Sequence, residues 1–232
     1  MENLFGRYEA VPADWKRDLI DIIAFLAIVE LMEYVVTLLA GSQSQLGAVV
    51  GVFGSVAVAW GLLIYRGEGW RAVGLRTPKP LWMVPVWILV VCVVAYGVNF
   101  VGPLLGETAN LERFAPLHGN LGLYLKLVAS IFITSALIEE LVFRGFLLSR
   151  LAGVLGPSVA GLGFACLIQA VIFGVAHAYQ GIAGIVLTGI FGFFAGVIYF
   201  LAGRNLWALI VAHGIVDSFG LTRIFLFGLP ES

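Results

Sequence analysis

Long apolar runs alternate with short polar connections along most of the chain. A helix that crosses a bilayer needs about 20 mainly apolar residues. Seven runs approach or exceed that length, and they cover about 19–40, 46–65, 81–103, 122–148, 159–179, 182–202 and 206–227. The pattern predicts an all-α fold: a polytopic membrane helix bundle with about seven transmembrane helices, within a range of six to eight.

Composition supports a membrane protein. Hydrophobic residues make up 61% of the chain and charged residues only 12%, whereas soluble domains carry about 25% charged residues. We expect residues 1–18 to form a cytoplasmic amino-terminal arm and residues 19–232 a single transmembrane domain. The net charge of −1 gives no indication of nucleic-acid binding. The two cysteines, Cys92 and Cys166, lie within apolar runs, which favours buried hydrophobic side chains over a disulfide or a metal pair.

Positive charge is concentrated in alternate connections. It is found in the amino-terminal arm, in the segment 66–79, and at the turns that hold Arg150 and Arg204. The other connections carry little of it, and the segment 104–120 has one arginine against two glutamates. Because cytoplasmic loops of membrane proteins are enriched in lysine and arginine, we expect the amino terminus in the cytoplasm and the carboxyl terminus outside. The segment 104–120 is then an outer loop.

Ionisable residues inside apolar runs are costly, so each is a functional-site hypothesis by default. They are Asp21, Glu30, Glu33, Glu139, Glu140, Arg144, His177, His213 and Asp217. Residues four apart share one face of a helix, which predicts a Glu140–Arg144 ion pair and places His213 beside Asp217. Glu139 points about 100° away from Glu140 and is free to face a cavity. No role for Glu30 or Glu33 follows from the sequence.

The depth of these residues predicts that three segments contribute to one site. At 1.5 Å per helical residue, Glu139, His177, His213 and Asp217 lie roughly 11–21 Å from the cytoplasmic ends of their helices. A carboxylate and an imidazole can hold and deprotonate a water, and a second histidine with its neighbour can stabilise an oxyanion. No serine or cysteine is placed as a nucleophile. The set therefore predicts hydrolysis of a peptide bond by an activated water, without a cofactor.

Two alternatives stay open at this point. Glu139, His177 and His213 also make a possible zinc set with water as the fourth ligand, although no HExxH motif is present. Buried acidic and imidazole groups also occur in proton-coupled transporters, although no internal repeat is evident. A non-catalytic membrane scaffold is a further alternative from a different class.

Three motifs resemble those of the CAAX protease and bacteriocin-processing (CPBP) family of intramembrane glutamic proteases. The family pattern is EExxxR, then FxxxH, then HxxxN or a close variant. Here the corresponding stretches are "EELVFR" from Glu139 to Arg144, "FGVAH" from Phe173 to His177, and "HGIVD" from His213 to Asp217. The resemblance covers about 120–220 and implies that the catalytic core lies there.

The resemblance also implies roles for individual residues. Glu139 and His177 would act on the catalytic water, and His213 and Asp217 would hold the oxyanion. Glu140 and Arg144 would organise the site, and Phe173 would pack against it. Asp217 departs from the common asparagine, and an ionised aspartate cannot donate a hydrogen bond to an oxyanion. Asp217 would donate to the oxyanion if it is protonated, and would otherwise orient His213.

The family resemblance implies a substrate that is a membrane-embedded or lipidated peptide or protein. Type II CAAX prenyl endopeptidases in this family remove a carboxyl-terminal tripeptide after prenylation, and bacterial members are tied to peptide maturation. We therefore expect processing of carboxyl-terminal (CAAX-like) or leader segments, by a multi-pass protein of a prokaryotic plasma membrane.

Overall fold

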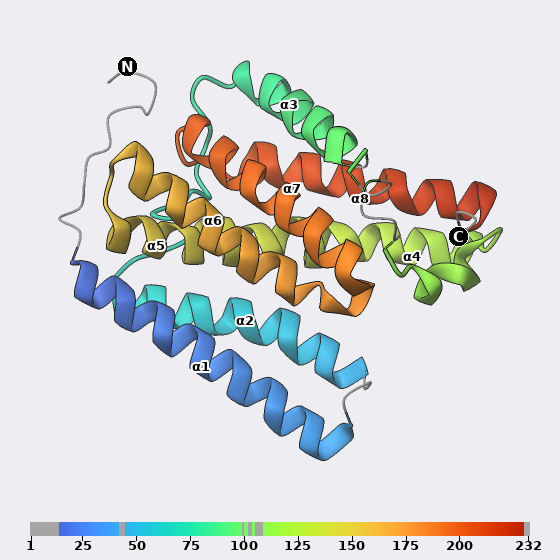
Figure 1. The fold of residues 1–232 in the computed structure, drawn as a ribbon, viewed down its shortest axis with the longest axis horizontal. Coiled ribbons are helices and arrows are strands. Elements are labelled where there is room, and N and C mark those ends of the chain that lie inside the picture. The colour runs from blue at the N-terminus through green and yellow to red at the C-terminus, as the bar shows by residue number, and fades with distance from the viewer. Residues whose placement is uncertain (1–13, 42–44, 99, 102–103, 105–108, 230–232) are drawn as a thin grey trace.

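The computed structural model describes residues 14–41, 45–98, 100–101, 104 and 109–229 (Figure 1). Every regular element in these residues is helical, which confirms the all-α membrane bundle. The main elements are α1 (Trp15–Ala40), α2 (Gln45–Tyr65), α3 (Met83–Val98), α4 (Leu121–Ile131), η3 (Phe132–Leu147), α5 (Leu148–Leu155), α6 (Val159–Ala176), α7 (Gly181–Leu201) and α8 (Trp207–Phe227). Two short 3₁₀ helices, η2 (Glu112–Leu117) and η4 (Ala178–Gln180), complete the described part.

Five helices are long and apolar enough to cross a membrane: Trp15–Ala40, Leu121–Leu155, Val159–Ala176, Ala178–Leu201 and Trp207–Phe227. The shorter apolar helices Val49–Tyr65 and Met83–Val98 correspond to the second and third predicted runs. The chain is therefore an integral membrane protein, and all seven predicted runs contain a helix.

The ends of the helices differ from the prediction in three places. Helix α1 begins at Trp15, because Asp14 caps it by accepting a hydrogen bond from the Arg17 backbone N–H at 3.3 Å; residues 1–13 of the expected arm lie outside the described residues. Helix α3 ends at Val98, and the rest of that run, to 103, includes residues outside the described part. The fourth helix continues to Leu155, so Arg150 lies within it rather than in a turn.

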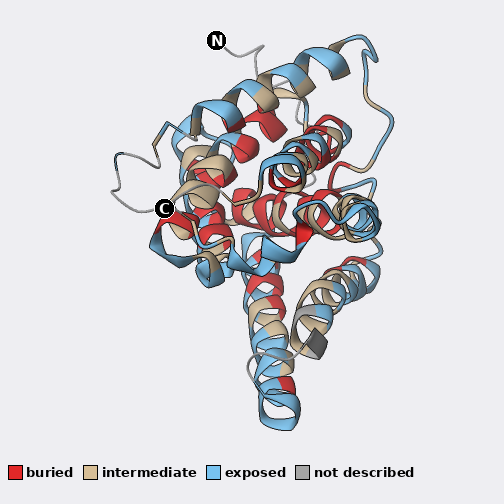
Figure 2. Cartoon of the chain, turned by 90° about the vertical axis from the view of Figure 1, so that its right-hand side faces the viewer, coloured by how far each residue is buried: buried red, intermediate tan, exposed pale blue. Residues whose placement is uncertain are grey.

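Helices α6 and α7 pack tightly against each other, and α8 lies between α3 and the long helix formed by α4, η3 and α5. The largest fully buried side chains, among them Phe146, Tyr199 and Leu209, lie where these helices meet. Figure 2 shows the α1–α2 hairpin extending away from this buried centre. The outward faces carry many exposed large apolar side chains, as expected for surfaces in contact with lipid.

Five charged side chains join α1, α2 and α5 at one end of the bundle. Arg66 contacts Asp18 at 3.0 Å and Asp21 at 2.8 Å. Arg150 contacts Asp21 at 3.0 Å and donates to Glu68 at 2.8 Å. Asp18, Asp21 and Arg150 are buried. This cluster fixes the start of α1 against the end of the long helix Leu121–Leu155, and the sequence did not predict it.

The connection between α2 and α3 is also bound to the α7–α8 turn at this end. The Tyr199 hydroxyl donates to the Val73 carbonyl at 2.9 Å, and the Asn205 side-chain amide donates to the Arg76 carbonyl at 2.6 Å. Gly74 has a φ of +110° and approaches the Arg204 carbonyl so closely that a β-carbon would lie 2.7 Å from it. The connections predicted to be rich in positive charge therefore share one end of the molecule.

Candidate active site

Glu139, Glu140 and Arg144 lie in η3, the central π-helical part of the continuous helix Leu121–Leu155. A π-helix pairs each N–H with the carbonyl five residues back, and such turns occur frequently at functional sites. The Leu148 N–H bonds the Phe143 carbonyl in this pattern. The wider turn was not predicted, because apolar periodicity does not distinguish it from an α-helix.

Glu140 lies at the centre of the charged groups. Its Oε1 accepts a hydrogen bond from Arg144 Nη1 at 3.0 Å and lies 2.8 Å from His213 Nδ1. Glu140 and Arg144 are 0% exposed and His213 is 5% exposed. The predicted Glu140–Arg144 ion pair is confirmed, whereas the contact between Glu140 and His213 was not predicted. With Glu140 ionised by Arg144, its oxygen accepts and His213 Nδ1 carries the proton.

Aromatic rings surround the Arg144 guanidinium. Its carbon lies 4.3 Å from the Phe173 ring centroid and 5.8 Å from the Phe191 ring centroid, within cation–π range. Phe173 also lies 4.6 Å from the His177 ring, and Phe191 lies 5.4 Å from the His213 ring. The rings separate the charged groups from the rest of the bundle. Phe191 was not predicted, because it lies in an uninterrupted apolar run that gives no local signal.

His177 lies at the end of α6, and the end of the helix determines what its ring contacts. The His177 backbone N–H bonds the Gly174 carbonyl at 2.9 Å, which leaves the Phe173 carbonyl without that backbone partner. His177 Nδ1 lies 2.8 Å from the Phe173 carbonyl oxygen. Because a carbonyl only accepts, Nδ1 is the donor, and in the neutral ring Nε2 carries the lone pair.

Asp217 lies one turn after His213 on α8. Its Oδ2 is 3.6 Å from His213 Nε2, and its side chain is 32% exposed, far more than that of His213. The two nitrogens of the His213 ring therefore face two different carboxylates, Glu140 at Nδ1 and Asp217 at Nε2.

Glu139 is half-buried, and one oxygen of its carboxyl group is enclosed. Among the described residues, its Oε2 has no hydrogen-bond partner, and no hydrogen bond joins it to either histidine. The bond between Glu140 and His213 joins η3 to α8, and the contacts from Arg144 to Phe173 and from Phe173 to His177 join η3 to α6. These contacts hold together the three helices that carry the four predicted catalytic side chains.

Comparison with known families assigns this part of the chain. Residues 121–219 match the family model described as "Type II CAAX prenyl endopeptidase Rce1-like". Residues 121–219 are an Rce1-like domain. No curated protein and no solved structure gives a significant match to the chain. The domain runs from the start of α4 into α8, so it contains all three motifs, and it indicates a membrane protease of the CAAX-processing kind.

The alternative zinc ligands Glu139, His177 and His213 all lie in the Rce1-like domain. Across the described ranges, no group of three or more His, Cys, Asp and Glu side chains is arranged to hold a metal ion. Of the alternative ligands Glu139, His177 and His213, the last has Nδ1 bonded to Glu140 and Nε2 facing Asp217. These contacts engage Nδ1 of His213 and leave Nε2 accessible.

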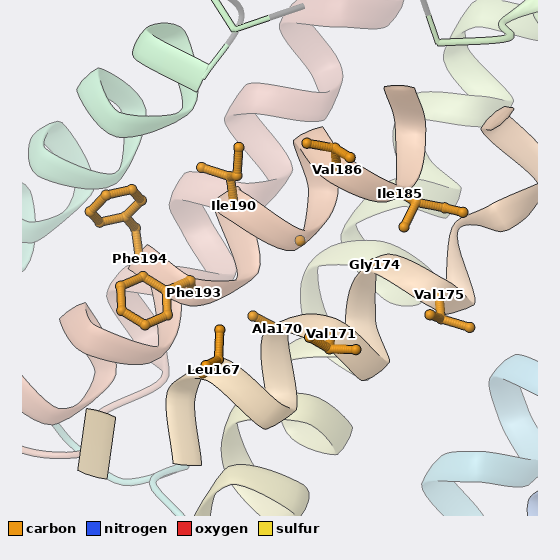
Figure 3. Close-up of a pocket in the computed structure, with 11 residues that line it drawn as sticks. Leu167, Ala170, Val171, Gly174, Val175, Ile185, Val186, Ile190, Phe193 and Phe194 are labelled. Atoms are coloured by element: carbon orange, nitrogen blue, oxygen red, sulfur yellow. The ribbon is translucent and has the colours of Figure 1, made fainter. Parts of the chain in front are cut away.

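An apolar groove of about 490 Å³ lies along α6 and α7 on the surface of the Rce1-like domain (Figure 3). It is lined by Leu167, Ala170, Val171, Gly174, Val175, Ile185, Val186, Gly189, Ile190, Phe193 and Phe194. No residue of the polar set lines it. The groove exists because the two helices approach through Gly174 and Gly189, which leave no side chain between their backbones. The groove is apolar and separate from the charged groups.

Proposed function

We propose that the chain is an intramembrane endopeptidase in which Glu139 and His177 activate a water, with His213 and Asp217 at the oxyanion. The observation that supports the proposal is the set of contacts through Glu140, Arg144 and Phe173 that joins the three helices carrying these side chains within the Rce1-like domain. Glu139 is the group suited to take a proton, because its buried Oε2 has no hydrogen-bond partner among the described residues.

The water is held between Glu139 and His177. His177 Nδ1 donates to the Phe173 carbonyl, so Nε2 can accept a hydrogen bond from the water and orient it. Glu139 takes one proton as the water oxygen attacks the carbonyl carbon of the scissile bond. The carbonyl electron pair moves onto its oxygen, and no covalent bond to the protein forms.

The developing oxyanion is stabilised by His213. A ring with carboxylates at both nitrogens can carry two protons, so that Nδ1 donates to Glu140 while Nε2 presents an N–H to the substrate. At 3.6 Å, the contact of Nε2 with Asp217 is too long to occupy that N–H fully. Asp217 therefore acts as an orienting group. The tetrahedral intermediate collapses when the amide nitrogen takes the proton held by Glu139, releasing an amine and a carboxylic acid.

The mechanism needs no metal. Glu139 is the base that deprotonates the water, a task that a metal ion performs in metalloproteases. His213 supplies the positive charge at the oxyanion.

The substrate and the orientation follow from the membrane setting. We infer that the substrate is a membrane-embedded or lipidated chain, cleaved near its carboxyl terminus or in a leader segment. We also infer that the end of the bundle with the Arg66–Arg150 cluster faces the cytoplasm of a prokaryote, because the positive connections gather there. Thr77→Cys and His118→Cys, both at exposed positions at opposite ends, test this: an impermeant maleimide should label only Cys at 118 in intact cells, and the reverse pattern rejects the orientation.

The decisive experiment compares wild-type protein with Glu139→Ala and Glu139→Gln in proteoliposomes that contain lipidated and unmodified membrane peptides. Both variants should lose turnover, since neither can take a proton from water. Glu30→Gln is the matched control, because it removes an exposed intramembrane carboxyl on α1 and should keep wild-type activity. Mass spectrometry of membrane-protein fragments from cells that carry each chain identifies the natural substrate. Undiminished cleavage by Glu139→Ala rejects the mechanism.

A further inference from the structure

A second group of buried polar atoms lies beside the site and takes no part in the proposed chemistry. Glu140 Oε2, Arg144 Nε and Nη2, and Gln169 Oε1 and Nε2 are all buried without a hydrogen-bond partner among the described residues. Glu140, Arg144 and Gln169 are each 0% exposed. A buried polar group left unpaired costs about 1–3 kcal/mol, so nearly all such groups have a protein or water partner.

Gln169 lies on the face of α6 that Arg144 contacts. The Arg144 guanidinium carbon is 4.3 Å from the Phe173 ring, and Arg144 is also within electrostatic range of Cys166. Gln169 follows Cys166 by three residues and precedes Phe173 by four, so all three share one helix face. A β-carbon at Gly196 would lie 3.2 Å from Cys166 Sγ and 3.4 Å from Gln169 Oε1. Gln169 therefore lies one helical turn before Phe173, the α6 residue that Arg144 contacts.

The unpaired atoms are chemically complementary. Arg144 has two donors without partners, and the Gln169 amide offers one acceptor and two donors. Glu140 Oε2 is an acceptor that the amide nitrogen can serve. One buried water with two to four polar partners satisfies most of the set.

We propose that Gln169 is a positioning residue: its amide oxygen accepts from one buried water that in turn accepts from Arg144, and so fixes the guanidinium. Arg144 Nη1 and His213 Nδ1 both bond the same oxygen, Glu140 Oε1. If the guanidinium turns, Glu140 Oε1 loses one of its two donors and the carboxylate moves with it. The His213 ring then shifts relative to the substrate carbonyl. The catalytic part of this inference rests on the proposed function, whereas the contact between Gln169 and Arg144 does not.

The test removes the amide without changing the size of the side chain. Gln169→Leu should lower kcat about 10- to 100-fold, the range expected for a displacement near 1 Å, and should leave KM unchanged. Gln169→Glu keeps an acceptor in the same place and should retain clearly more activity than Gln169→Leu. Cys166→Ala changes packing on the same face without touching a polar contact, and should retain wild-type kcat.

If the Gln169 amide makes no polar contact, the opposite pattern of activities is expected. Replacing an unpaired buried amide by an apolar side chain of similar shape is nearly neutral or stabilising, so Gln169→Leu would then be fully active and at least as stable as wild type. That outcome overturns the proposal, as does Gln169→Glu activity no higher than that of Gln169→Leu.

A measurement without turnover separates this proposal from the proposed function. In ¹⁵N-arginine-labelled protein, the Nε–H resonance of Arg144, assigned by its loss in Arg144→Lys, should shift in Gln169→Leu and stay in place in Cys166→Ala. An unshifted resonance in Gln169→Leu overturns the contact even if the protein is an active protease. A shifted resonance in a protein that cleaves nothing supports the contact and refutes only the function.

Discussion

The buried pair Glu140–Arg144 gives a prediction in which stability and activity respond differently. Glu140→Leu leaves Arg144 buried without its carboxylate, and Arg144→Met leaves Glu140 buried without its guanidinium. The double variant Glu140→Leu/Arg144→Met removes both charges and fills their space with apolar atoms.

The magnitudes follow from complete burial of both side chains. Removing one partner of a buried ion pair costs about 3–5 kcal/mol, because the other charge stays desolvated, whereas replacing both by apolar side chains is often neutral or stabilising. The double variant should therefore recover most of the unfolding free energy that each single variant loses. Activity should not recover, because His213 Nδ1 has lost the carboxylate that fixes its protonation. Loss of such an orienting carboxylate lowers kcat by up to about 10⁴-fold in the serine protease triad.

The assay is a double-mutant cycle of unfolding in mixed micelles with increasing SDS, run in parallel with peptide cleavage. Single losses that simply add in the double variant contradict the view that the two charges compensate each other. A double variant that regains wild-type turnover contradicts the role of Glu140 in holding His213.

The other predictions concern the ion cluster, the helix contact and metal dependence. Arg150→Met should lower the unfolding free energy by about 3–5 kcal/mol, because buried carboxylates lose a partner. Arg17→Ala removes an exposed ion pair and should lower it by less than about 1 kcal/mol. Equal losses in the SDS titration contradict the burial argument. Gly174→Ala places a β-carbon 2.5 Å from the Ile185 carbonyl and should reduce both stability and cleavage by separating α6 from α7. Gly163→Ala on the same helix meets nothing within 4 Å and should be neutral or stabilising by up to about 1 kcal/mol. Turnover should survive EDTA and 1,10-phenanthroline, and a loss that zinc reverses would restore the metal alternative.

The sequence was sufficient to predict contacts that are local in the chain. The apolar runs predicted the helices because hydrophobic length is the strongest constraint on a bilayer-crossing segment. Glu140 and Arg144 are four residues apart, so helical geometry alone predicted their pairing. Contacts between helices depend instead on packing, and the bond from Glu140 to His213, 73 positions later, has no local signal.

Three further features escaped prediction for identifiable physical reasons. The π-helical turn at η3 has the same apolar composition as an α-helix. Arg150 was predicted in a turn because an arginine at the end of an apolar run usually lies in a solvent-exposed connection. Here Asp21 and Glu68 neutralise its charge within the helix. The bond of the His177 ring to the Phe173 carbonyl exists only because α6 ends one residue earlier, and helix ends are the least reliable part of any prediction.

Because the helices differ in length, the thickness of the bilayer affects the depth of His177 in the membrane. Helix α6 has 18 residues and is about 27 Å long, slightly shorter than a typical 30 Å hydrocarbon layer, whereas the 35 residues of Leu121–Leu155 reach up to about 50 Å. A thicker bilayer can be matched by the long helix through a smaller tilt, but α6 has no spare length. Lipids with longer acyl chains would therefore draw the His177 end of α6 into hydrocarbon while leaving Glu139 at its depth.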